Sequence, residues 1–197
     1  LSIADTITYL FCEKMNIDPT NPKMPERDRF VLSKGHCAPA LYGILAEKGY
    51  FDAEEIKSLR HIGSMLQGHP DMNKVPGVDM STGSLGQGIS AACGMALGSK
   101  LKGDKFRVYT ILGDGEIQEG QVWEAAMYAP HNKVDNLIAA VDYNGAQIDG
   151  STDQVLSLGN LRAKWEAFGW DVLEVAKGND MAAVVAGIEE AKSHTGK

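Results

Sequence analysis

The sequence has few cysteines, and their spacing excludes two kinds of stabilised scaffold. Only three occur in 197 residues, Cys12, Cys37 and Cys93, and no two of them form a C-x-x-C pair. Neither a disulfide framework nor a zinc site is therefore indicated. Free thiols are typical of a reducing compartment, so we expect a cytoplasmic protein whose cysteines are small core side chains.

Long apolar runs and an excess of positive charge are also missing. No apolar stretch approaches the roughly 20 residues that a membrane span requires, and no basic segment followed by a short apolar core opens the chain. The formal net charge is -7, which leaves no basic stripe for a phosphate backbone. We therefore expect neither a membrane nor a nucleic acid as a partner.

Length and composition favour one globular domain. Hydrophobic residues make up 44% of the sequence and charged residues 23%, which are ordinary globular values. A chain of 197 residues can bury one sizeable core but is short for two. It starts at Leu1 without a methionine, so we expect residues 1–197 to be a single domain trimmed from something longer.

Strand-like and helix-like segments alternate in the second half, which favours a parallel sheet with crossover helices. The predicted strands are 106–112, 137–143 and 170–175, and the predicted helices are 120–128, 158–168 and 181–193. A strand, a helix and a second strand in that order form a βαβ unit. We therefore expect an α/β fold.

The first half is predicted to be more helical and to contain one long connection. The predicted helices are 3–15, 39–48, 53–61 and 88–102, of which the last is rich in small residues that allow close packing. Asp52 followed by Glu55 is typical of a capping box at the start of the third helix. Residues 62–87 hold five glycines and two prolines, and so long a connection in a compact domain is usually functional or disordered.

The segment ILGDGEIQEGQVWEAA, residues 111–126, breaks an apolar strand at Gly113-Asp114-Gly115 and then reopens as a helix. Such a tripeptide can simply bend the chain, because glycine and aspartate are common turn residues. Alternatively, Asp114 stands at the carboxyl end of a parallel strand, where ligands bind in open α/β sheets. Asn144 follows the next predicted strand, so both side chains would project into one crevice if the two strands are neighbours.

A carboxylate and an amide oxygen in one crevice suit a hard divalent cation. Magnesium takes about six oxygen ligands and commonly receives only a few of them from protein, while phosphates and water supply the others. Asp114, Asn144, one backbone carbonyl and a diphosphate would complete such a site. Gly115 would let the backbone approach a phosphate, and the helix that opens near Gly120 would add favourable N–H groups. Two strand-end residues together favour this interpretation over a simple bend.

Gly113-Asp114-Gly115, with Asn144 thirty residues after the aspartate, resembles the thiamine diphosphate motif, and the string GDGEIQEGQVWEAA is similar to that of the transketolases. Three further segments agree with that family in order: FVLSKGHCAPALY at 30–42, LQGHPD at 66–71 and MSTGSLGQGISAACGMALG at 80–98. The resemblance covers nearly the whole chain. It implies the N-terminal, diphosphate-side domain or subunit of a transketolase, with a three-layer fold that has helices on both faces of a parallel sheet.

The resemblance assigns metal and cofactor contacts to the strand-end residues. Asp114 and Asn144 would bind Mg²⁺, or another divalent cation such as Ca²⁺ or Mn²⁺, through their side chains, and Ala146 would bind it through its carbonyl oxygen. Gly115 would donate its N–H to the diphosphate of the cofactor, near the Asn144 ligand.

Two histidines are implied to be catalytic. His36 of SKGH would line the channel beside the cofactor diphosphate, and His69 of GHP would lie beside the hydroxyl groups of the sugar donor. Imidazole can donate to a phosphate or to a developing alkoxide. A lone histidine is more often structural, but two histidines in matching motifs favour the catalytic role. His61, His131 and His194 match no motif and are expected at the surface or at helix ends.

Gly83, Ser84 and Leu85 would lie against the aminopyrimidine ring of the cofactor. A glycine-rich loop before a helix also suggests a dinucleotide fingerprint, but its spacing is reversed and no strand or acidic residue stands at the required distance. NAD is therefore excluded. Ile148 would pack on the cofactor rings, although an apolar residue at that position is also simply a core residue.

Glu119 and Glu124 would lie about 140° apart if both were helical, so they cannot share one helical face. We expect Glu119 in a loop and Glu124 in the first turns of the helix. In transketolases the matching carboxylates lie at the dimer interface, in a network that links two active sites. The resemblance therefore places both at an interface and Glu119 also near the cofactor, although acidic residues suit a helix N-terminus by themselves.

The implied activity is the transfer of a two-carbon ketol unit from a ketose phosphate to an aldose phosphate. The glutamate that activates the cofactor belongs to a pyrimidine-binding domain outside this chain, so we expect the chain alone to be catalytically incomplete. The implied partner is a C-terminal transketolase domain or subunit, in a homodimer or a heterotetramer. The family's early glycine- and histidine-containing loop and its last strand also fall outside residues 1–197, which leaves both a fragment and a split enzyme open.

Four alternatives are retained. A deoxyxylulose-phosphate synthase or a 2-oxo acid dehydrogenase would share GDG and the later asparagine, but the string E-x-x-E-G-x-x-W-E-A and the histidine of GHP favour a transketolase. A split enzyme could instead use an unusual branched sugar phosphate as its donor. From a different class, the chain could be a non-catalytic module that binds Mg²⁺ and phosphate.

Overall fold

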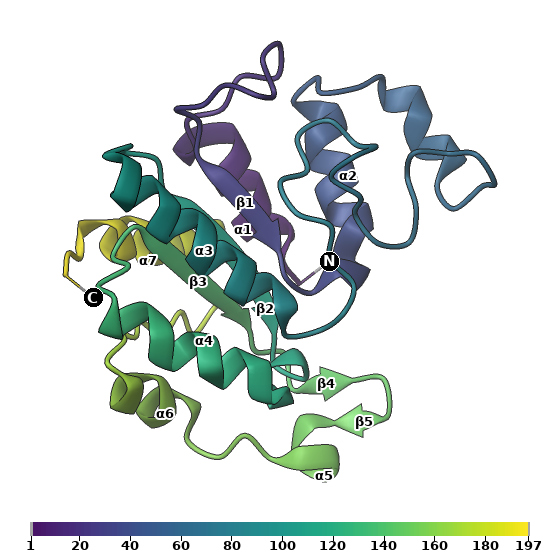
Figure 1. The fold of residues 1–197 in the computed structure, drawn as a ribbon. Coiled ribbons are helices and arrows are strands. Elements are labelled where there is room, and N and C mark those ends of the chain that lie inside the picture. The colour runs from purple at the N-terminus through teal and green to yellow at the C-terminus, as the bar shows by residue number, and fades with distance from the viewer. Residues whose placement is uncertain (1, 197) are drawn as a thin grey trace.

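A parallel sheet lies at the centre of the computed structural model, which describes residues 2–196 (Figure 1). The sheet consists of β1 (Arg29–Leu32), β2 (Val108–Gly113) and β3 (Leu137–Asp142), hydrogen-bonded in the order β1-β2-β3. Both strand pairs are parallel. The carboxyl ends of all three strands therefore meet at the same edge of the sheet.

Within residues 2–196, seven α-helices and a small hairpin accompany the sheet. The helices are α1 (Ala4–Tyr9), α2 (Ala38–Glu47), α3 (Gln87–Lys102), α4 (Gly120–His131), α5 (Thr152–Leu156), α6 (Leu161–Phe168) and α7 (Met181–Ser193). Shorter elements are a π-helical turn at Leu10–Lys14 and 3-10 turns at Gly35–Cys37, Ala53–Ser58 and Glu116–Gln118. The antiparallel hairpin pairs β4 (Ala146–Gln147) with β5 (Gly150–Ser151). None of the described helices is long and apolar enough to cross a membrane.

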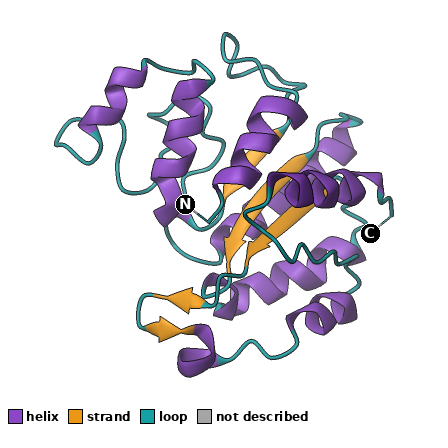
Figure 2. Ribbon diagram, turned by 180° about the vertical axis from the view of Figure 1, so that it is seen from behind, coloured by secondary structure: helices purple, strands orange, loops and turns teal. Residues whose placement is uncertain are grey.

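Helices cover both faces of the sheet, because side chains alternate between the faces along each strand. Tyr109 and Ile111 of β2 pack into one apolar cluster with α1 and α2, whereas Val108 and Leu112 pack into a second cluster with α3 and α4. Figure 1 shows α3 and α4 on one face with α1 and α7 on the other, and Figure 2 shows the sheet from behind. The predicted α/β fold with helices on both faces of a parallel sheet is confirmed.

Most predicted elements are confirmed to within a few residues. The predicted segments 39–48, 88–102, 106–112, 120–128, 137–143 and 181–193 correspond to α2, α3, β2, α4, β3 and α7. The predicted helix 3–15 is α1 followed by the π-helical turn. The predicted helix 158–168 begins only at Leu161, because the Asn160 side chain caps it by accepting the N–H of Ala163.

The predicted helix at 53–61 is instead the 3-10 turn Ala53–Ser58. Asp52 caps it, accepting the N–H of Glu54 at 2.9 Å. The helix does not continue because Leu59 leaves the helical conformation with a ψ of 124°, and Arg60 then adopts a left-handed conformation with a φ of 64°. The chain then enters the long predicted connection, which contains neither helix nor strand up to the start of α3.

The predicted strand at 170–175 is not found in the described residues. The segment pairs with no strand, and a cavity of about 900 Å³ is lined jointly by β3 and residues 170–176. Trp170 is anchored to the helical layer, because its indole N–H donates to the carbonyl of Ala126 at 2.8 Å. The apolar pattern therefore reflects the packing of Trp170 and Val172 against the second apolar cluster, and the prediction of strand pairing is wrong.

The cysteines differ from one another in burial, contrary to the expectation of three core side chains. Cys12 is exposed and Cys37 is half-buried, whereas Cys93 is buried in α3. Burial raises the pKa of the Cys93 thiol to about 11. Only Cys93 is thus a core side chain, and it is held as an unreactive thiol.

A buried ion pair ties the long connection to the first strand. Arg27 and Asp79 are each 8% exposed. The Arg27 guanidinium donates to both carboxylate oxygens of Asp79, to Oδ2 at 3.0 Å. The same Oδ2 atom accepts the N–H of Phe30 in β1 at 2.8 Å. The connection that carries the glycine-rich loop is therefore anchored to the strand beside it.

Replacing the buried carboxylate tests this anchor. Asp79→Asn is expected to lower the free energy of unfolding by about 3–5 kcal/mol, because it leaves the Arg27 guanidinium buried without its counterion. Urea-induced unfolding followed by circular dichroism measures the change. The control is Glu54→Gln, in an ion pair whose side chains are 72% and 75% exposed, which should change stability by less than about 0.5 kcal/mol. Equal effects of the two substitutions would contradict the anchoring role.

Candidate functional site

Four loops meet at the carboxyl edge of the sheet. Three of them follow the strands β1, β2 and β3, and they begin at Ser33, Asp114 and Tyr143. The fourth is the glycine-rich loop at 82–86, directly before α3. Because open α/β sheets bind ligands beyond the carboxyl ends of their strands, this edge is the candidate functional site.

Asp114 is the buried centre of this edge, with 2% of its surface exposed. Its Oδ1 atom accepts the N–H of Gly115 at 2.8 Å, and its Oδ2 atom accepts the N–H of Gly145 at 2.6 Å. Its own N–H donates to the carbonyl of Asp142 at 3.2 Å. The carboxylate therefore links the end of β2 to the turn after β3, and the two strands are neighbours, which is the condition for a shared crevice.

Asn144 and Ala146 add further oxygen atoms next to this carboxylate. Both residues are exposed, and Oδ1 of Asn144 accepts the N–H of Ala146 at 3.0 Å. Carboxylate, amide and carbonyl oxygens are the ligands that hard divalent cations prefer. Among residues 2–196, no three side chains of His, Cys, Asp and Glu gather so that they could hold a metal ion. A cation here would thus depend on the mixed oxygen set.

Two buried donors beside the same loops lack hydrogen-bond partners within the described residues: Oγ1 of Thr82 and Nε2 of Gln147. A Cβ atom added to Gly115 would lie 2.8 Å from Oε1 of Gln147, and one added to Gly35 would lie 2.7 Å from Oγ1 of Thr82. An unsatisfied buried donor costs about 1–3 kcal/mol. An anion that accepts from these groups would remove that cost, so the residues present fit a diphosphate.

Glu116 joins three of the four loops through its buried carboxylate, which belongs to a residue 2% exposed. Its Oε1 atom accepts the hydroxyl of Ser33 at 2.6 Å and the N–H of Gly86 at 3.0 Å. Its Oε2 atom accepts the N–H of Gly113 at 3.0 Å. The sequence motifs include Glu116 as the first residue of E-x-x-E-G but assign it no role. Its place directly after GDG is the signal that could have indicated one.

A second buried pair joins the ends of β1 and β3. Nζ of Lys34 lies 2.6 Å from Oδ2 of Asp142, and the two side chains are 4% and 11% exposed. The hydroxyl of Ser2 donates to the same oxygen at 2.5 Å. Burial alone would raise the pKa of Asp142, but the hydrogen bonds from Lys34 and Ser2 outweigh it and hold that pKa below its usual value. The sequence does not predict this pair either, because Lys34 and Asp142 are far apart in the chain and neither residue alone indicates that the other lies beside it.

The glycine-rich loop brings the motifs of the two predicted histidines together. A Cβ atom on Gly83 would lie 2.8 Å from Cγ of His69, and one on Gly35, the neighbour of His36, would lie 2.7 Å from the backbone nitrogen of Gly83. Gly83 has a φ of 145°, a conformation that glycine adopts readily. SKGH, GHP and TGS are far apart in the sequence and are in contact in the fold.

His36 is influenced mainly through the electrostatics of its ring, whereas His69 is positioned through its backbone. Burial of part of the His36 ring lowers its pKa, and the Lys34 ammonium lowers it further. His36 is therefore mainly neutral at neutral pH, with one nitrogen that can donate and one that can accept. The loop carrying His69 is fixed by the Tyr42 hydroxyl, which lies 2.9 Å from the carbonyl oxygen of Gln67 and 3.1 Å from that of His69.

The remaining predicted cofactor contacts lie at the surface of this edge. Ser84 and Leu85 are exposed. Ile148 is completely exposed, with a relative surface of 103%. The interpretation of Ile148 as a core residue is therefore wrong, because its hairpin projects away from the apolar clusters.

Glu119 and Glu124 occupy the kinds of position expected for them. Glu119 lies outside the helix, at the residue that precedes α4, and Glu124 lies inside α4. Both are exposed. A Cβ atom on Gly86 would lie 2.9 Å from Cβ of Glu119, so Glu119 packs against the glycine-rich loop. Both carboxylates are therefore available to a contact from outside the chain.

Comparison with known sequences gives a consistent result over the whole chain. The family model for the transketolase, thiamine diphosphate binding domain, matches residues 1–197. The 6-deoxy-6-sulfo-D-fructose transketolase subunit SqwG of Clostridium sp. (strain MSTE9) is 51% identical over 100% of this chain and 71% of its own length. An apulose-4-phosphate transketolase subunit of Phocaeicola vulgatus is 44% identical over 94% of this chain and 65% of its own length. The transketolase of Homo sapiens is 43% identical, and the alignment covers 88% of this chain but 28% of the human protein.

Solved structures agree with the sequence comparison. A transketolase of Pichia stipitis in complex with sedoheptulose-7-phosphate superimposes with a TM-score of 0.94 at 36% identity, over 99% of this chain and 30% of that chain. The transketolase of Leishmania mexicana superimposes with a TM-score of 0.90 at 34% identity, over 96% of this chain and 30% of that chain. The chain thus spans less than a third of these solved proteins and about two thirds of the relatives that are named as subunits.

The role of Glu116 can be tested by a substitution that keeps its shape. Glu116→Gln is expected to lower the free energy of unfolding by about 2–3 kcal/mol, because an amide NH₂ would face either Gly86 N–H or Gly113 N–H and leave that donor unsatisfied. Chemical unfolding of both proteins gives the difference. Glu55→Gln, at an exposed position, is the control and should be close to neutral. A neutral Glu116→Gln would show that its three hydrogen bonds do not hold the loops.

The pair of Lys34 and Asp142 predicts a dependence of stability on pH. The folded pKa of Asp142 is lowered, so its contribution to stability is present above the unfolded pKa of about 3.9 and is lost as the pH falls below it. In Lys34→Met, burial would act without the ammonium, and the pKa of Asp142 should rise above its wild-type value. Carboxyl carbon chemical shifts measured against pH give both pKa values. An unchanged pKa in the variant would refute the assignment.

Proposed function

The chain belongs to the transketolase, thiamine diphosphate binding domain family, and from that premise we propose that it is the cofactor-holding part of a transketolase-type transferase. The proposed reaction moves a two-carbon ketol unit from a ketose phosphate to an aldose phosphate. Bound thiamine diphosphate would supply the nucleophilic carbon for that transfer. The observation that carries the proposal is the 2.6 Å bond from Gly145 N–H to Asp114, which sets the GDG carboxylate against the Asn144 turn.

The oxygen atoms at this turn would hold the cation that the diphosphate requires. Asp114 and Asn144 would bind Mg²⁺, or Ca²⁺ or Mn²⁺ in its place, through side-chain oxygens, and Ala146 would add its carbonyl oxygen. Gly115 N–H donates to Asp114 in the structure, so it would exchange that acceptor for a diphosphate oxygen. Nε2 of Gln147 is a further donor without a partner in the described residues.

The histidines and the glycine-rich loop would position cofactor and substrate. His36, neutral because its pKa is lowered, would donate to the diphosphate. His69, fixed by the bond from Tyr42 to its carbonyl, would donate to a hydroxyl of the sugar. Gly83, Ser84 and Leu85 would contact the aminopyrimidine ring, for which the loop offers backbone and exposed side chains next to His69.

Exposed apolar side chains after β3 support a covering partner. Tyr143, Ile148 and Leu156, all in the short segment after β3, are 57%, 103% and 57% exposed, and exposed apolar side chains in one segment suit an interface. We place there a C-terminal transketolase domain or subunit that carries the glutamate for the pyrimidine, in a homodimer or a heterotetramer. Glu119 and Glu124 would lie in the same interface. On this proposal the chain alone is catalytically incomplete.

The names of relatives favour ketol transfer over the other reactions considered. Two relatives are named as transketolase subunits for different sugars, 6-deoxy-6-sulfo-D-fructose and apulose 4-phosphate. A ketose phosphate is the proposed donor, and a sulfonated ketose is the second candidate because of the first of these names. A synthase of deoxyxylulose phosphate, a 2-oxo acid dehydrogenase and a non-catalytic module have less support. The proposed enzyme acts in the cytoplasm, where thiols stay reduced.

Calorimetry of thiamine diphosphate binding tests the cofactor site directly. The chain is titrated with the cofactor in the presence and absence of Mg²⁺, first alone and then with a candidate C-terminal partner. Heat of binding that requires Mg²⁺ is expected, and Asp114→Asn should weaken it by at least about tenfold, since a ligand carboxylate is lost. Glu54→Gln, at an exposed residue distant in the sequence from Asp114, is the control, and this variant should bind the cofactor as the wild type does.

Each result separates the candidate functions. Binding in neither sample, with circular dichroism of a folded protein, would refute the cofactor proposal. Binding without ketol transfer in the complete mixture would favour the non-catalytic module. Transfer that appears only when chain and partner are mixed supports a split enzyme, and comparison of phosphorylated with sulfonated ketoses then identifies the donor class. Metal-dependent binding that survives in Asp114→Asn would overturn the metal assignment alone.

A further inference from the structure

A cavity of about 630 Å³ lies at the opposite edge of the sheet, where the strands begin. Asp28 stands directly before β1 and Arg107 directly before β2. Lys14 ends the π-helical turn after α1, and Lys192 lies in the last turn of α7. The length of β2, about 20 Å at normal strand spacing, separates this cavity from Asp114. The cavity is therefore distinct from the candidate cofactor site.

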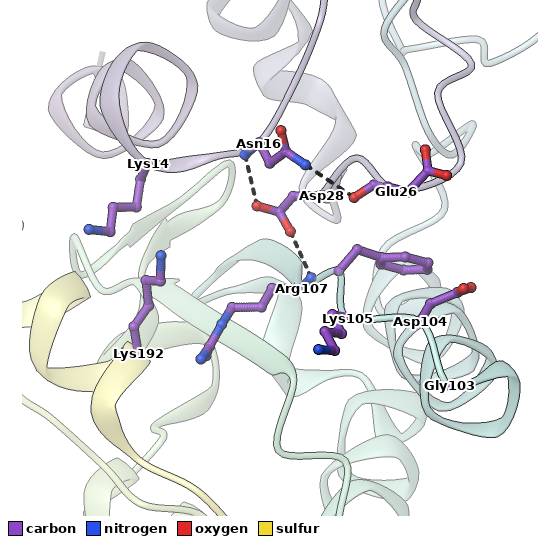
Figure 3. A pocket seen from close by; sticks show the side chains of 10 residues that line it. Lys14, Asn16, Glu26, Asp28, Gly103, Asp104, Lys105, Arg107 and Lys192 are labelled. Atoms are coloured by element: carbon purple, nitrogen blue, oxygen red, sulfur yellow. Dashed lines mark hydrogen bonds between the residues drawn. The ribbon is translucent and has the colours of Figure 1, made fainter.

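Three cations gather on one side of this cavity. Figure 3 shows Lys14, Arg107 and Lys192 close together there. Lys14 forms an ion pair with Glu189, whose carboxylate also accepts the Tyr9 hydroxyl at 2.5 Å. Within residues 2–196, no ion pair involves the side chain of Arg107 or that of Lys192. Two of the three cations thus have no ion-pair partner among the described residues.

The nearest buried carboxylate is bonded to backbone groups and forms no ion pair with these cations in the described residues. Asp28 is 8% exposed. Its Oδ1 atom accepts the backbone N–H of Arg107 at 2.7 Å, and its Oδ2 atom accepts that of Asn16 at 2.9 Å. Both bonds hold the backbone where the strands begin. The guanidinium of Arg107 therefore remains free to bind a group in the cavity.

The three cations repel one another across this side of the cavity. Burial lowers the pKa of Lys192, and the charges of Lys14 and Arg107 lower it further, whereas the carboxylates of Asp28 and Glu189 only partly offset these effects. Lysines at the C-terminal ends of helices are stabilised by the helix dipole, and this is sufficient to explain why lysine occurs at positions 14 and 192. It does not account for Arg107, which precedes a strand. An anion between the three side chains would relieve the repulsion and give each cation an acceptor.

The other side of the cavity has acceptors for hydroxyl groups. Figure 3 shows Glu26 and Asp104 there, across from the three cations. Both are exposed. Carboxylates bind the hydroxyl groups of polyols well, because each oxygen accepts more than one hydrogen bond. A ligand with an anionic end and a hydroxylated end would therefore match both walls.

We propose that this cavity binds a small phosphorylated polyol, with its phosphate between Arg107, Lys192 and Lys14 and its hydroxyl groups at Glu26 and Asp104. Its volume lies in the range of small-molecule sites. Arg107 supplies a planar pair of donors that suits phosphate oxygens, and the lysines add point charges. The ligand would connect α7 to the beginning of β2. Free phosphate shares the anionic chemistry of the ester, so the experiment must separate the two.

Amide chemical shifts of the isotopically labelled chain locate the site. The chain is titrated with glycerol 3-phosphate, with inorganic phosphate, and with sodium chloride at matched ionic strength. Shifts are expected at residues 105–108 and 189–193, with tighter binding of glycerol 3-phosphate than of phosphate. Equal affinities would overturn the hydroxyl contacts of the proposal. Shifts that sodium chloride reproduces, or that occur only near Asp114, would overturn the site.

Variants of the cavity give a second measurement of the same proposal. Arg107→Gln should weaken glycerol 3-phosphate binding about tenfold, the usual effect of losing one charged hydrogen bond. Arg107→Lys keeps the charge and should retain much of the affinity. Lys57→Gln, in an exposed ion pair away from the cavity, should leave affinity unchanged. An Arg107→Gln protein with native amide shifts and wild-type affinity would refute the role of the guanidinium.

Discussion

The carboxylate of Glu116 holds together three loops that are distant in the sequence. It accepts the hydroxyl of Ser33 after β1, the N–H of Gly86 in the glycine-rich loop and the N–H of Gly113 at the end of β2. A buried carboxylate must have its acceptor sites filled, because an unsatisfied buried charge is very costly. The same requirement that stabilises Glu116 therefore sets the relative positions of the loops, and Asp114 and His36 depend on those loops for their places.

Around this centre, charge is organised in two ways. Near the candidate cofactor site it is neutralised in a buried pair, Lys34 with Asp142, and a second buried pair, Arg27 with Asp79, lies where β1 begins. These pairs give rigidity, and Lys34 also lowers the pKa of His36, which suits a neutral hydrogen-bonding imidazole. At the far edge, Arg107 and Lys192 have no such partner in the described residues, and the cavity between them has the features of a separate anion site.

Much of the fold follows from local patterns. The strands β2 and β3 and the helices α3, α4 and α7 have long apolar or small-residue periodicities, which the sequence displays directly. β1 escapes prediction because its four residues between charged flanks are too few to show a period. The segment 170–175 has the composition of a strand, yet composition describes burial and not the hydrogen-bonded neighbour that defines a strand.

The amino-acid sequence is enough to predict the α/β class, the end of β2 at GDG and the candidate ligands Asp114 and Asn144, since these depend on order along the chain. The contacts between distant groups are visible only in the folded chain: Glu116 meets Ser33 and Gly86, and Gly83 meets His69. A motif can be read from neighbouring residues, whereas a buried charge is stable, and a close backbone contact exists, only if a partner from elsewhere in the chain lies beside it. That partner is set by how the strands and loops pack.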